Sequence, residues 1–193
     1  MYPSDRPSPC VRPGRWPTVV GVSDEYRTLL LLRHAKSDYP HGVVDHERPL
    51  APRGIREAAL AGDWLRAHVP AVDAVLCSTA TRTRQTLART GIDAPVEFAD
   101  RLYDASPGTV IDEINTVASR FTADVRTLLV IGHEPAMSQV AIGLADVETS
   151  DRAAAEDILT KYPTSAIAVL RTAGPWDRVA LNSAALLTFH VPR

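Results

Sequence analysis

Two histidines and two arginines follow short apolar runs of the chain, and their side chains are of the types that handle phosphate. Arg33 and His34 come directly after one run, Arg82 shortly after a second, and His133 directly after a third. A neutral imidazole is a competent nucleophile toward phosphorus. A guanidinium group presents paired donors to phosphate oxygens and stays charged at any working pH. These residues therefore predict phosphoryl chemistry.

Each of the four side chains can be given a role in such a reaction. Phosphoryl transfer needs mainly positioning and neutralisation of the phosphoryl oxygens. We expect His34 to attack, Arg33 and Arg82 to hold the oxygens, and His133 to donate to them as their charge grows. These cations supply the positive charge themselves, and the remaining histidines have no metal-ligand spacing with cysteines or carboxylates. We therefore expect neither a metal ion nor another cofactor.

The three apolar runs have the composition of strands that are covered on both faces of a sheet. They occupy residues 28–32, 74–77 and 127–131, and continuous apolar runs of this length are typical of buried parallel strands. Ligands of open parallel sheets bind beyond the carboxyl ends of the strands. Two of the loops that follow these runs also lead into predicted helices, whose N-terminal N–H groups favour anions. The spacing therefore predicts one anion-binding crevice.

Helical patterns alternate with the strands, which predicts one α/β domain around a mainly parallel sheet. Helices are expected over 52–68, 79–90, 107–121 and 151–159, with another opened by Pro135, and later strands over 166–170, 179–181 and 186–189. Residues 1–26 are rich in proline and arginine and lack an apolar period. We expect them to form a disordered leader, followed by a single domain over residues 27–193.

Composition excludes several other classes of protein. The 193 residues include 21 basic and 23 acidic side chains, for a formal net charge of -2, so no basic surface for nucleic acid is predicted. No apolar stretch is long enough to cross a membrane, and no signal peptide is recognisable. Cys10 and Cys77 are too few for a disulfide framework. The default expectation is a cytoplasmic protein.

The order of these motifs resembles the histidine phosphatase superfamily (phosphoglycerate mutase-like), and most closely its SixA-type phosphohistidine phosphatases. The similar segments are Arg33-His34-Ala35-Lys36-Ser37, the stretch around Arg82, Gly132-His133-Glu134-Pro135, and residues 45–54 and 163–169. The resemblance covers residues 28–190 and implies a three-layer fold. It also implies that His34 is the nucleophile, that Arg33, Arg82 and His133 complete the phosphate pocket, and that Ser37 lies near the phosphate.

Three questions stay open at the level of sequence. The general acid could be Asp104, Glu134 or neither. The substrate could be phosphohistidine in a protein or a small phosphate ester, and a non-catalytic phosphate-binding module is a third alternative. The oligomeric state cannot be predicted.

Overall fold

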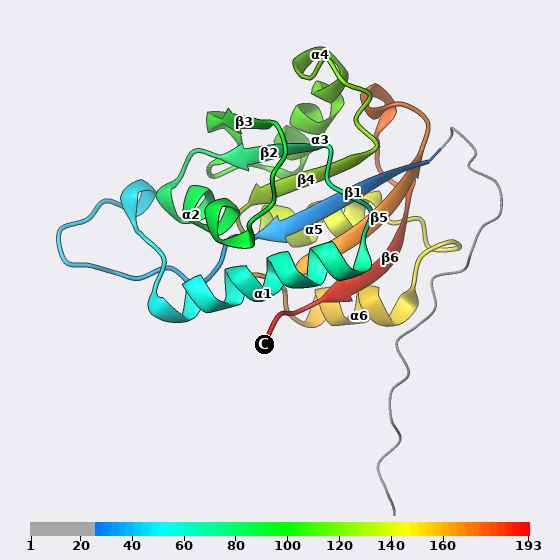
Figure 1. Cartoon of the computed structure of the whole chain (residues 1–193). Coiled ribbons are helices and arrows are strands. Elements are labelled where there is room, and N and C mark those ends of the chain that lie inside the picture. The colour runs from blue at the N-terminus through cyan, green and yellow to red at the C-terminus, as the bar shows by residue number, and fades with distance from the viewer. Residues whose placement is uncertain (1–25) are drawn as a thin grey trace, which may run out of the picture.

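The computed structural model describes residues 26–193 as a six-stranded sheet between two layers of helices (Figure 1). The predicted leader therefore lies outside the described residues, apart from Tyr26, which begins the first strand. The strands are β1 (Tyr26–Arg33), β2 (Ala74–Ser78), β3 (Val96–Ala99), β4 (Thr127–Gly132), β5 (Ile167–Ala173) and β6 (Ala184–His190). The α-helices are α1 (Pro52–His68), α2 (Thr81–Thr90), α3 (Pro107–Asn115), α4 (Val117–Arg120), α5 (Ala136–Leu144) and α6 (Arg152–Thr160).

The sheet is mixed, with strand order β3-β2-β4-β1-β5-β6. The pairs β2–β3, β2–β4 and β1–β4 are parallel, whereas β5 is antiparallel to both β1 and β6. The predicted single α/β domain with a mainly parallel sheet is thus confirmed. Two predictions were wrong: residues 179–181 form no strand, and the helix expected over 107–121 is divided at Thr116, whose N–H closes the end of α3.

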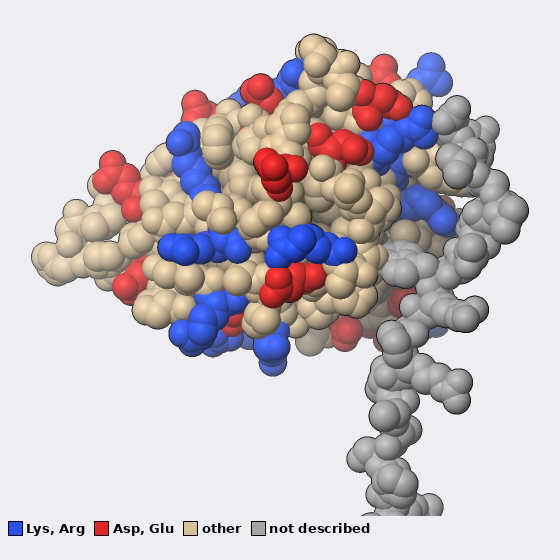
Figure 2. All heavy atoms as spheres, viewed as in Figure 1, with Lys and Arg blue, Asp and Glu red and all other residues tan. Residues whose placement is uncertain are grey.

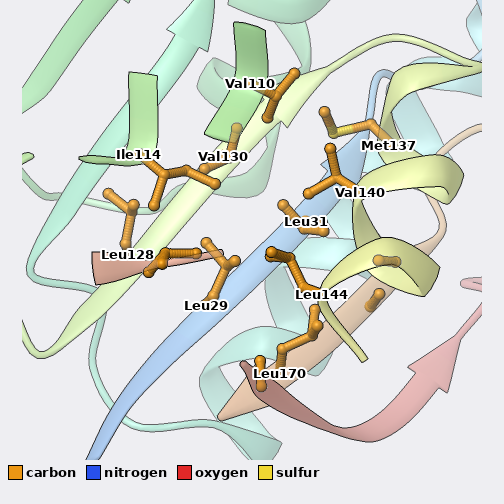
Figure 3. Close-up of a cluster of buried hydrophobic side chains, with 14 of the residues drawn as sticks. Leu29, Leu31, Val110, Ile114, Leu128, Val130, Met137, Val140, Leu144 and Leu170 are labelled. Carbon is orange, nitrogen blue, oxygen red and sulfur yellow. The ribbon is translucent and has the colours of Figure 1, made fainter. Parts of the chain in front are cut away.

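The strand β1 explains why helices cover both faces of the sheet. Its run of leucines is completely buried, and successive side chains point to opposite faces. Leu29 and Leu31 pack with the side chains of α3 and α5 in the larger core (Figure 3). Leu30 and Leu32 pack with those of α1 and α2 in the second core. Two apolar faces require two helical layers, so the predicted three-layer fold is confirmed.

The carboxyl ends of β1, β2 and β4 lie along one edge of the sheet. Arg33, at the end of β1, is in register with Gly132 of β4, and Cys77 near the end of β2 pairs with Ile131. The loop between β1 and α1 projects beyond this edge, at the left of Figure 1, and contains the short 3₁₀ helix η1 (Asp45–Glu47). The predicted motifs are therefore gathered at one end of the sheet.

Candidate active site

His34 is the first residue after β1, and its backbone fixes the position of its ring. The N–H of His34 donates to the carbonyl oxygen of Gly132 at 3.0 Å, which extends the ladder between β1 and β4. Its ring Nδ1 lies 2.8 Å from the carbonyl oxygen of Ala35. Because a carbonyl only accepts, Nδ1 must carry the proton of the neutral ring. The Nε2 atom is then left with the lone pair that a nucleophile requires.

The surroundings of His34 favour that neutral form. Burial lowers the pKa of its imidazole from 6.5 to about 4, against the opposing effect of the Ala35 carbonyl, and the charges of Arg82 and Arg33 lower it further. Only 8% of the residue is exposed. At neutral pH the ring is therefore unprotonated and available to attack.

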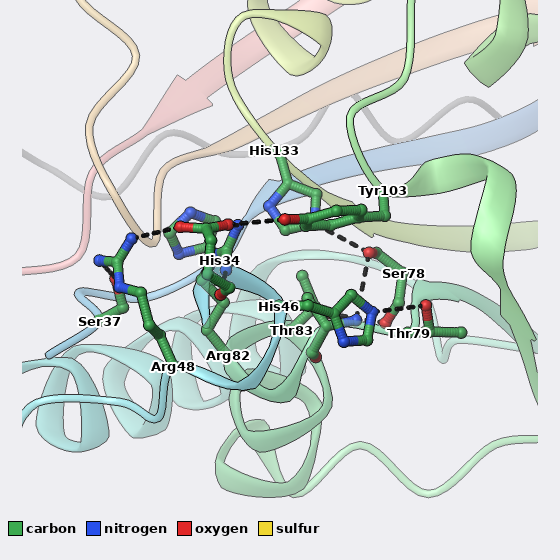
Figure 4. Close-up of polar contacts among 12 residues, drawn as sticks. His34, Ser37, His46, Arg48, Ser78, Thr79, Arg82, Thr83, Tyr103 and His133 are labelled. Atoms are coloured by element: carbon green, nitrogen blue, oxygen red, sulfur yellow. Dashed lines mark hydrogen bonds and ion pairs between the residues drawn. The ribbon is translucent and has the colours of Figure 1, made fainter. Parts of the chain in front are cut away.

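His133 follows β4 and lies beside His34, with ring centroids 5.2 Å apart. Its Nε2 is 2.8 Å from Oγ of the buried Ser78, at the end of β2, while its Nδ1 is buried without a hydrogen-bond partner (Figure 4). Burial is the main cause that lowers the pKa of His133 to about 3, followed by the neighbouring His34 and Arg82. If Ser78 donates to Nε2, the proton of the neutral His133 ring is on Nδ1.

Arg82 lies in the first turn of α2, and its side chain is almost completely buried. Its Nη1 donates to the carbonyl oxygen of Asp45 at 2.7 Å, and its Nη2 donates to the Asp45 carboxylate at 3.0 Å. A guanidinium group has five N–H donors, so others remain for an anion. The charge of Arg82 acts on both His34 and His133, which places all three groups in one site.

Arg33 and Ser37 flank this centre. Nη1 of Arg33 donates to the carbonyl oxygen of Tyr162 at 2.6 Å, its buried Nε has no partner, and its charge lowers the pKa of His34. Ser37 is buried, and its Oγ accepts a hydrogen bond from Nη2 of Arg48 at 2.7 Å. The structure therefore brings together the four predicted principal residues, whereas Ser37 is linked to Arg82 only through Arg48 and Asp45.

A cavity of about 220 Å³ opens beside these groups. It contains both predicted candidates for the general acid: Asp104, which is exposed, and Glu134, whose carboxylate accepts from the N–H of Ser138 at 3.1 Å. Two hollows of about 340 Å³ elsewhere are bordered by mainly apolar surface and by no histidine. The residues that line the cavity are Asp45, Arg82, Tyr103, Asp104, Ala105, His133, Glu134 and Pro135.

Residues 29–183 match the family model of the histidine phosphatase superfamily, branch 1. The chain belongs to the histidine phosphatase superfamily. This membership supports a phosphatase, and hence hydrolase, activity. An uncharacterized protein of Mycobacterium tuberculosis is 65% identical over 162 residues, which cover 84% of this chain and the whole of that protein. One from Mycobacterium leprae is 53% identical over 166 residues, again along its whole length.

Solved structures agree with this assignment. A structure from Nakamurella multipartitia, proposed to be the phosphohistidine phosphatase SixA, is 40% identical with a TM-score of 0.77, and the match covers 86% of this chain and 96% of that one. The protein histidine phosphatase SixA, complexed with tungstate, has a TM-score of 0.66 at 22% identity, covering 86% and 97% of the two chains. The second likeness supports the fold. The chain is thus a SixA-like histidine phosphatase.

Two residues that border the site in this histidine phosphatase, Asp45 and Tyr103, were given no role from the sequence alone. Asp45 contacts Arg82 and Arg48, and the phenol of Tyr103 donates to the same Asp45 carboxylate at 2.8 Å. The only available signal was that residues 45–54 resemble the SixA branch. That resemblance marks a segment, and it does not indicate which side chains turn toward the histidines.

Three further features of residues 26–193 concern metal binding, the crossing of a membrane and the reactivity of cysteine. No group of three or more histidine, cysteine, aspartate or glutamate residues in this range could hold a metal ion. Within the same range, no helix is long and apolar enough to cross a membrane. Cys77 is completely buried, and burial raises the pKa of its thiol to about 12, so it behaves as a small apolar residue.

Proposed function

We propose that this protein removes phosphate from phosphohistidine in proteins, with His34 as the nucleophile and a phosphorylated His34 as the intermediate. The observation that supports this most strongly is the state of the His34 ring. Its proton is held at Nδ1 by the Ala35 carbonyl, and its pKa is lowered to about 4, mainly by burial. A neutral, oriented imidazole beside arginines is suited to attack on phosphorus.

In the first step, Nε2 of His34 forms a bond to the phosphorus while the bond from phosphorus to the leaving nitrogen of the substrate breaks. The leaving imidazole takes up a proton from solvent water as it departs. Arg33 and Arg82 stabilise the phosphoryl oxygens, and His133 donates to the same oxygens as their charge increases. Ser78 positions His133 for this task through its contact with Nε2.

In the second step, water attacks the phosphorus of phospho-His34, the bond from phosphorus to Nε2 breaks, and the water gives up a proton. Inorganic phosphate leaves, and the neutral ring of His34 is restored. His34 keeps its Nδ1 proton throughout, because Nδ1 donates a hydrogen bond to the Ala35 carbonyl oxygen. One nitrogen can therefore serve as both nucleophile and leaving group.

A small phosphate ester is the second candidate substrate, and one observation favours it. The cavity beside the histidines contains Asp104 and Glu134, either of which could protonate a departing alkoxide. Phosphohistidine needs such an acid less, since imidazole is a better leaving group than an alkoxide. We favour phosphohistidine because the Nakamurella multipartitia structure, proposed to be a phosphohistidine phosphatase, is 40% identical over most of both chains.

The substrate assignment can be tested by measuring kcat/KM for a phosphohistidine peptide, a phosphoserine peptide and a panel of small phosphate esters, each with and without EDTA. We expect the phosphohistidine peptide to give the highest value, and EDTA to have no effect. His34→Gln provides the blank for background hydrolysis. A small ester that exceeds the phosphohistidine peptide would contradict the assignment, and loss of activity with EDTA would indicate a metal-dependent mechanism.

A further inference from the structure

The carboxylate of Asp45 is surrounded by donors in the way that a bound oxyanion would be. Its Oδ1 accepts from Nη1 of Arg48 at 2.6 Å. Its Oδ2 accepts from the phenol of Tyr103 at 2.8 Å and from Nη2 of Arg82 at 3.0 Å. Figure 4 shows these three donor side chains converging from separate segments of the chain. Two guanidinium groups and a phenol therefore form a receptor for oxygen anions, and a side chain of the protein occupies it.

This receptor adjoins the site proposed for the phosphate. Asp45, Arg82, Tyr103 and His133 all border the same cavity, and the charge of Asp45 acts on His133. Hydrogen bonding from Tyr103 is the main cause that lowers the pKa of Asp45 to about 2, with Arg48 and Arg82 adding to it. The carboxylate is thus ionised at neutral pH. A phosphoryl group bound to Arg82 would meet a like charge on the same guanidinium.

Asp45 is placed so that its side chain can withdraw. About half of the side chain, 52%, is exposed, although the Arg82 side chain that it contacts is only 8% exposed. The helix η1 has a separate attachment to the site, since Nε2 of His46 lies 3.1 Å from Oγ1 of Thr79 and its ring packs edge-on against Tyr103. The carboxylate of Asp45 can therefore turn toward solvent while η1 remains in place.

We propose that Asp45 is an internal competitor for the phosphate, and that Arg48 and Tyr103 are further substrate-binding residues. When a phosphoryl group enters, its oxygens take the donors of Arg82, Arg48 and Tyr103 from the carboxylate, which moves into solvent. The phosphate has the advantage in this exchange because it carries more charge and more acceptor oxygens than a carboxylate. This inference rests on the proposed function, in which Arg82 holds the phosphate.

The competition can be measured as the affinity of the protein for inorganic phosphate, by titration calorimetry at pH 7. Asp45→Asn removes the charge and keeps the shape, so we expect phosphate to bind about tenfold more tightly. Glu47→Gln is the matched control: it removes one negative charge from the same 3₁₀ helix, and Glu47 is exposed with no side-chain hydrogen bond or ion pair to residues 26–193. Its affinity should equal that of the wild type.

An affinity of Asp45→Asn that is unchanged or weaker would overturn the proposal, because it would show that Asp45 only positions Arg82. Circular dichroism and the melting temperature would establish that each variant is folded. Phosphate binding needs no turnover, so this result is independent of whether His34 becomes phosphorylated.

The role of Arg48 needs a second comparison. In the Asp45→Asn background, the further change Arg48→Gln should weaken phosphate binding by about tenfold, because a charged donor to the phosphate is lost. If Arg48 only holds Asp45 in place, phosphate should bind equally well with and without Arg48 in this background. That equality would remove Arg48 from the substrate-binding residues.

Discussion

The two histidines of the site stay neutral, and the arginines beside them favour that state. Burial is the largest cause in both cases, and the nearby cations add to it. In the proposed function the arginines therefore have two effects: they attract an anionic substrate, and they help to keep the ring of His34 unprotonated. His34 and His133 are each only 8% exposed, so this neutral state depends on the packing of the fold around them.

The buried, neutral histidines should make stability depend on pH. Unfolded His34 binds a proton as the pH falls through about 6.5, whereas folded His34 does so near pH 4. The unfolded state therefore binds more protons in this window, and stability is full above pH 6.5 and is lost as the pH falls toward 4. Between pH 7 and pH 5, His34 should account for about 2 kcal/mol of lost unfolding free energy.

Urea denaturation of the wild type and of His34→Gln at both pH values measures this contribution. Glutamine does not titrate, so the variant should lose about 2 kcal/mol less than the wild type. Equal losses in the two proteins would show that the pKa of His34 is not lowered by folding.

Arg82→Lys should reduce catalysis although it keeps the positive charge. The guanidinium of Arg82 presents two terminal nitrogens, which both contact Asp45 in the free protein, and lysine cannot present such a pair. We expect kcat and kcat/KM to fall together, by roughly 10²-fold, as for loss of one oxyanion donor. Arg84→Lys, an exposed position on the same helix, is the control. A change in KM alone would mean that Arg82 contributes only to docking.

At the scale of elements, α1 packs against α2, the helix that carries Arg82. Gly62 of α1 packs directly on the backbone of Thr90, where a Cβ atom would lie 1.9 Å from the Thr90 carbonyl oxygen. We expect Gly62→Ala to lower the unfolding free energy by about 2 kcal/mol or more, because neither backbone can yield locally. Gly108→Ala in α3 is the control, since its nearest neighbour would be 3.8 Å away.

Thermal and urea unfolding of both glycine variants provide the measurement. Gly108→Ala should be neutral or stabilising, because alanine favours helix more than glycine does. Equal stability of the two variants would show that the α1–α2 contact tolerates an added methyl group.

The elements that could be predicted are those with a strong local pattern. The buried strands β1, β2 and β4 are continuous apolar runs, and α1 was predicted over residues 52–68, the range it occupies. The edge strand β3 gave no such run, since Glu97 and Phe98 are exposed. Residues 179–181 are apolar but form no strand, and Leu181 is largely exposed.

The same reasoning explains which parts of the site were missed. His34 and His133 follow buried strands, so strand position alone places them at one edge of the sheet. Asp45 and Tyr103 lie in loops, and their contacts join segments 37 and 58 residues apart. No periodicity or local motif encodes such contacts, because they depend on how the loops pack against one another.

At the scale of the whole molecule, the surface carries mixed charge around a single α/β body. Figure 2 shows basic and acidic side chains interspersed on the face that includes α1. The attraction for phosphate must then come from the local cluster at the sheet edge, which agrees with a net charge of only -2.

The proposed domain over residues 27–193 can be tested by truncation. A chain that begins at residue 24 should match the full chain in melting temperature and kcat/KM, because β1 and all described site contacts are retained. The comparison with the 65% identical relative supports this, since the whole of that protein aligns to 84% of this chain. A chain that begins at residue 30 should fail to fold, since it lacks half of a strand that pairs with both β4 and β5. Loss of activity in the first chain would mean that residues 1–23 contribute to the site.

The central claim, that His34 carries the phosphoryl group, is tested most directly by trapping the intermediate on the intact protein. The wild type and His34→Gln are mixed with a radiolabelled phosphohistidine peptide, quenched within the first turnover in alkali, and digested for peptide mapping. We predict a base-stable, acid-labile label on the peptide that contains His34 in the wild type, and none in the variant. Label on another residue, or full turnover by His34→Gln, would contradict the account.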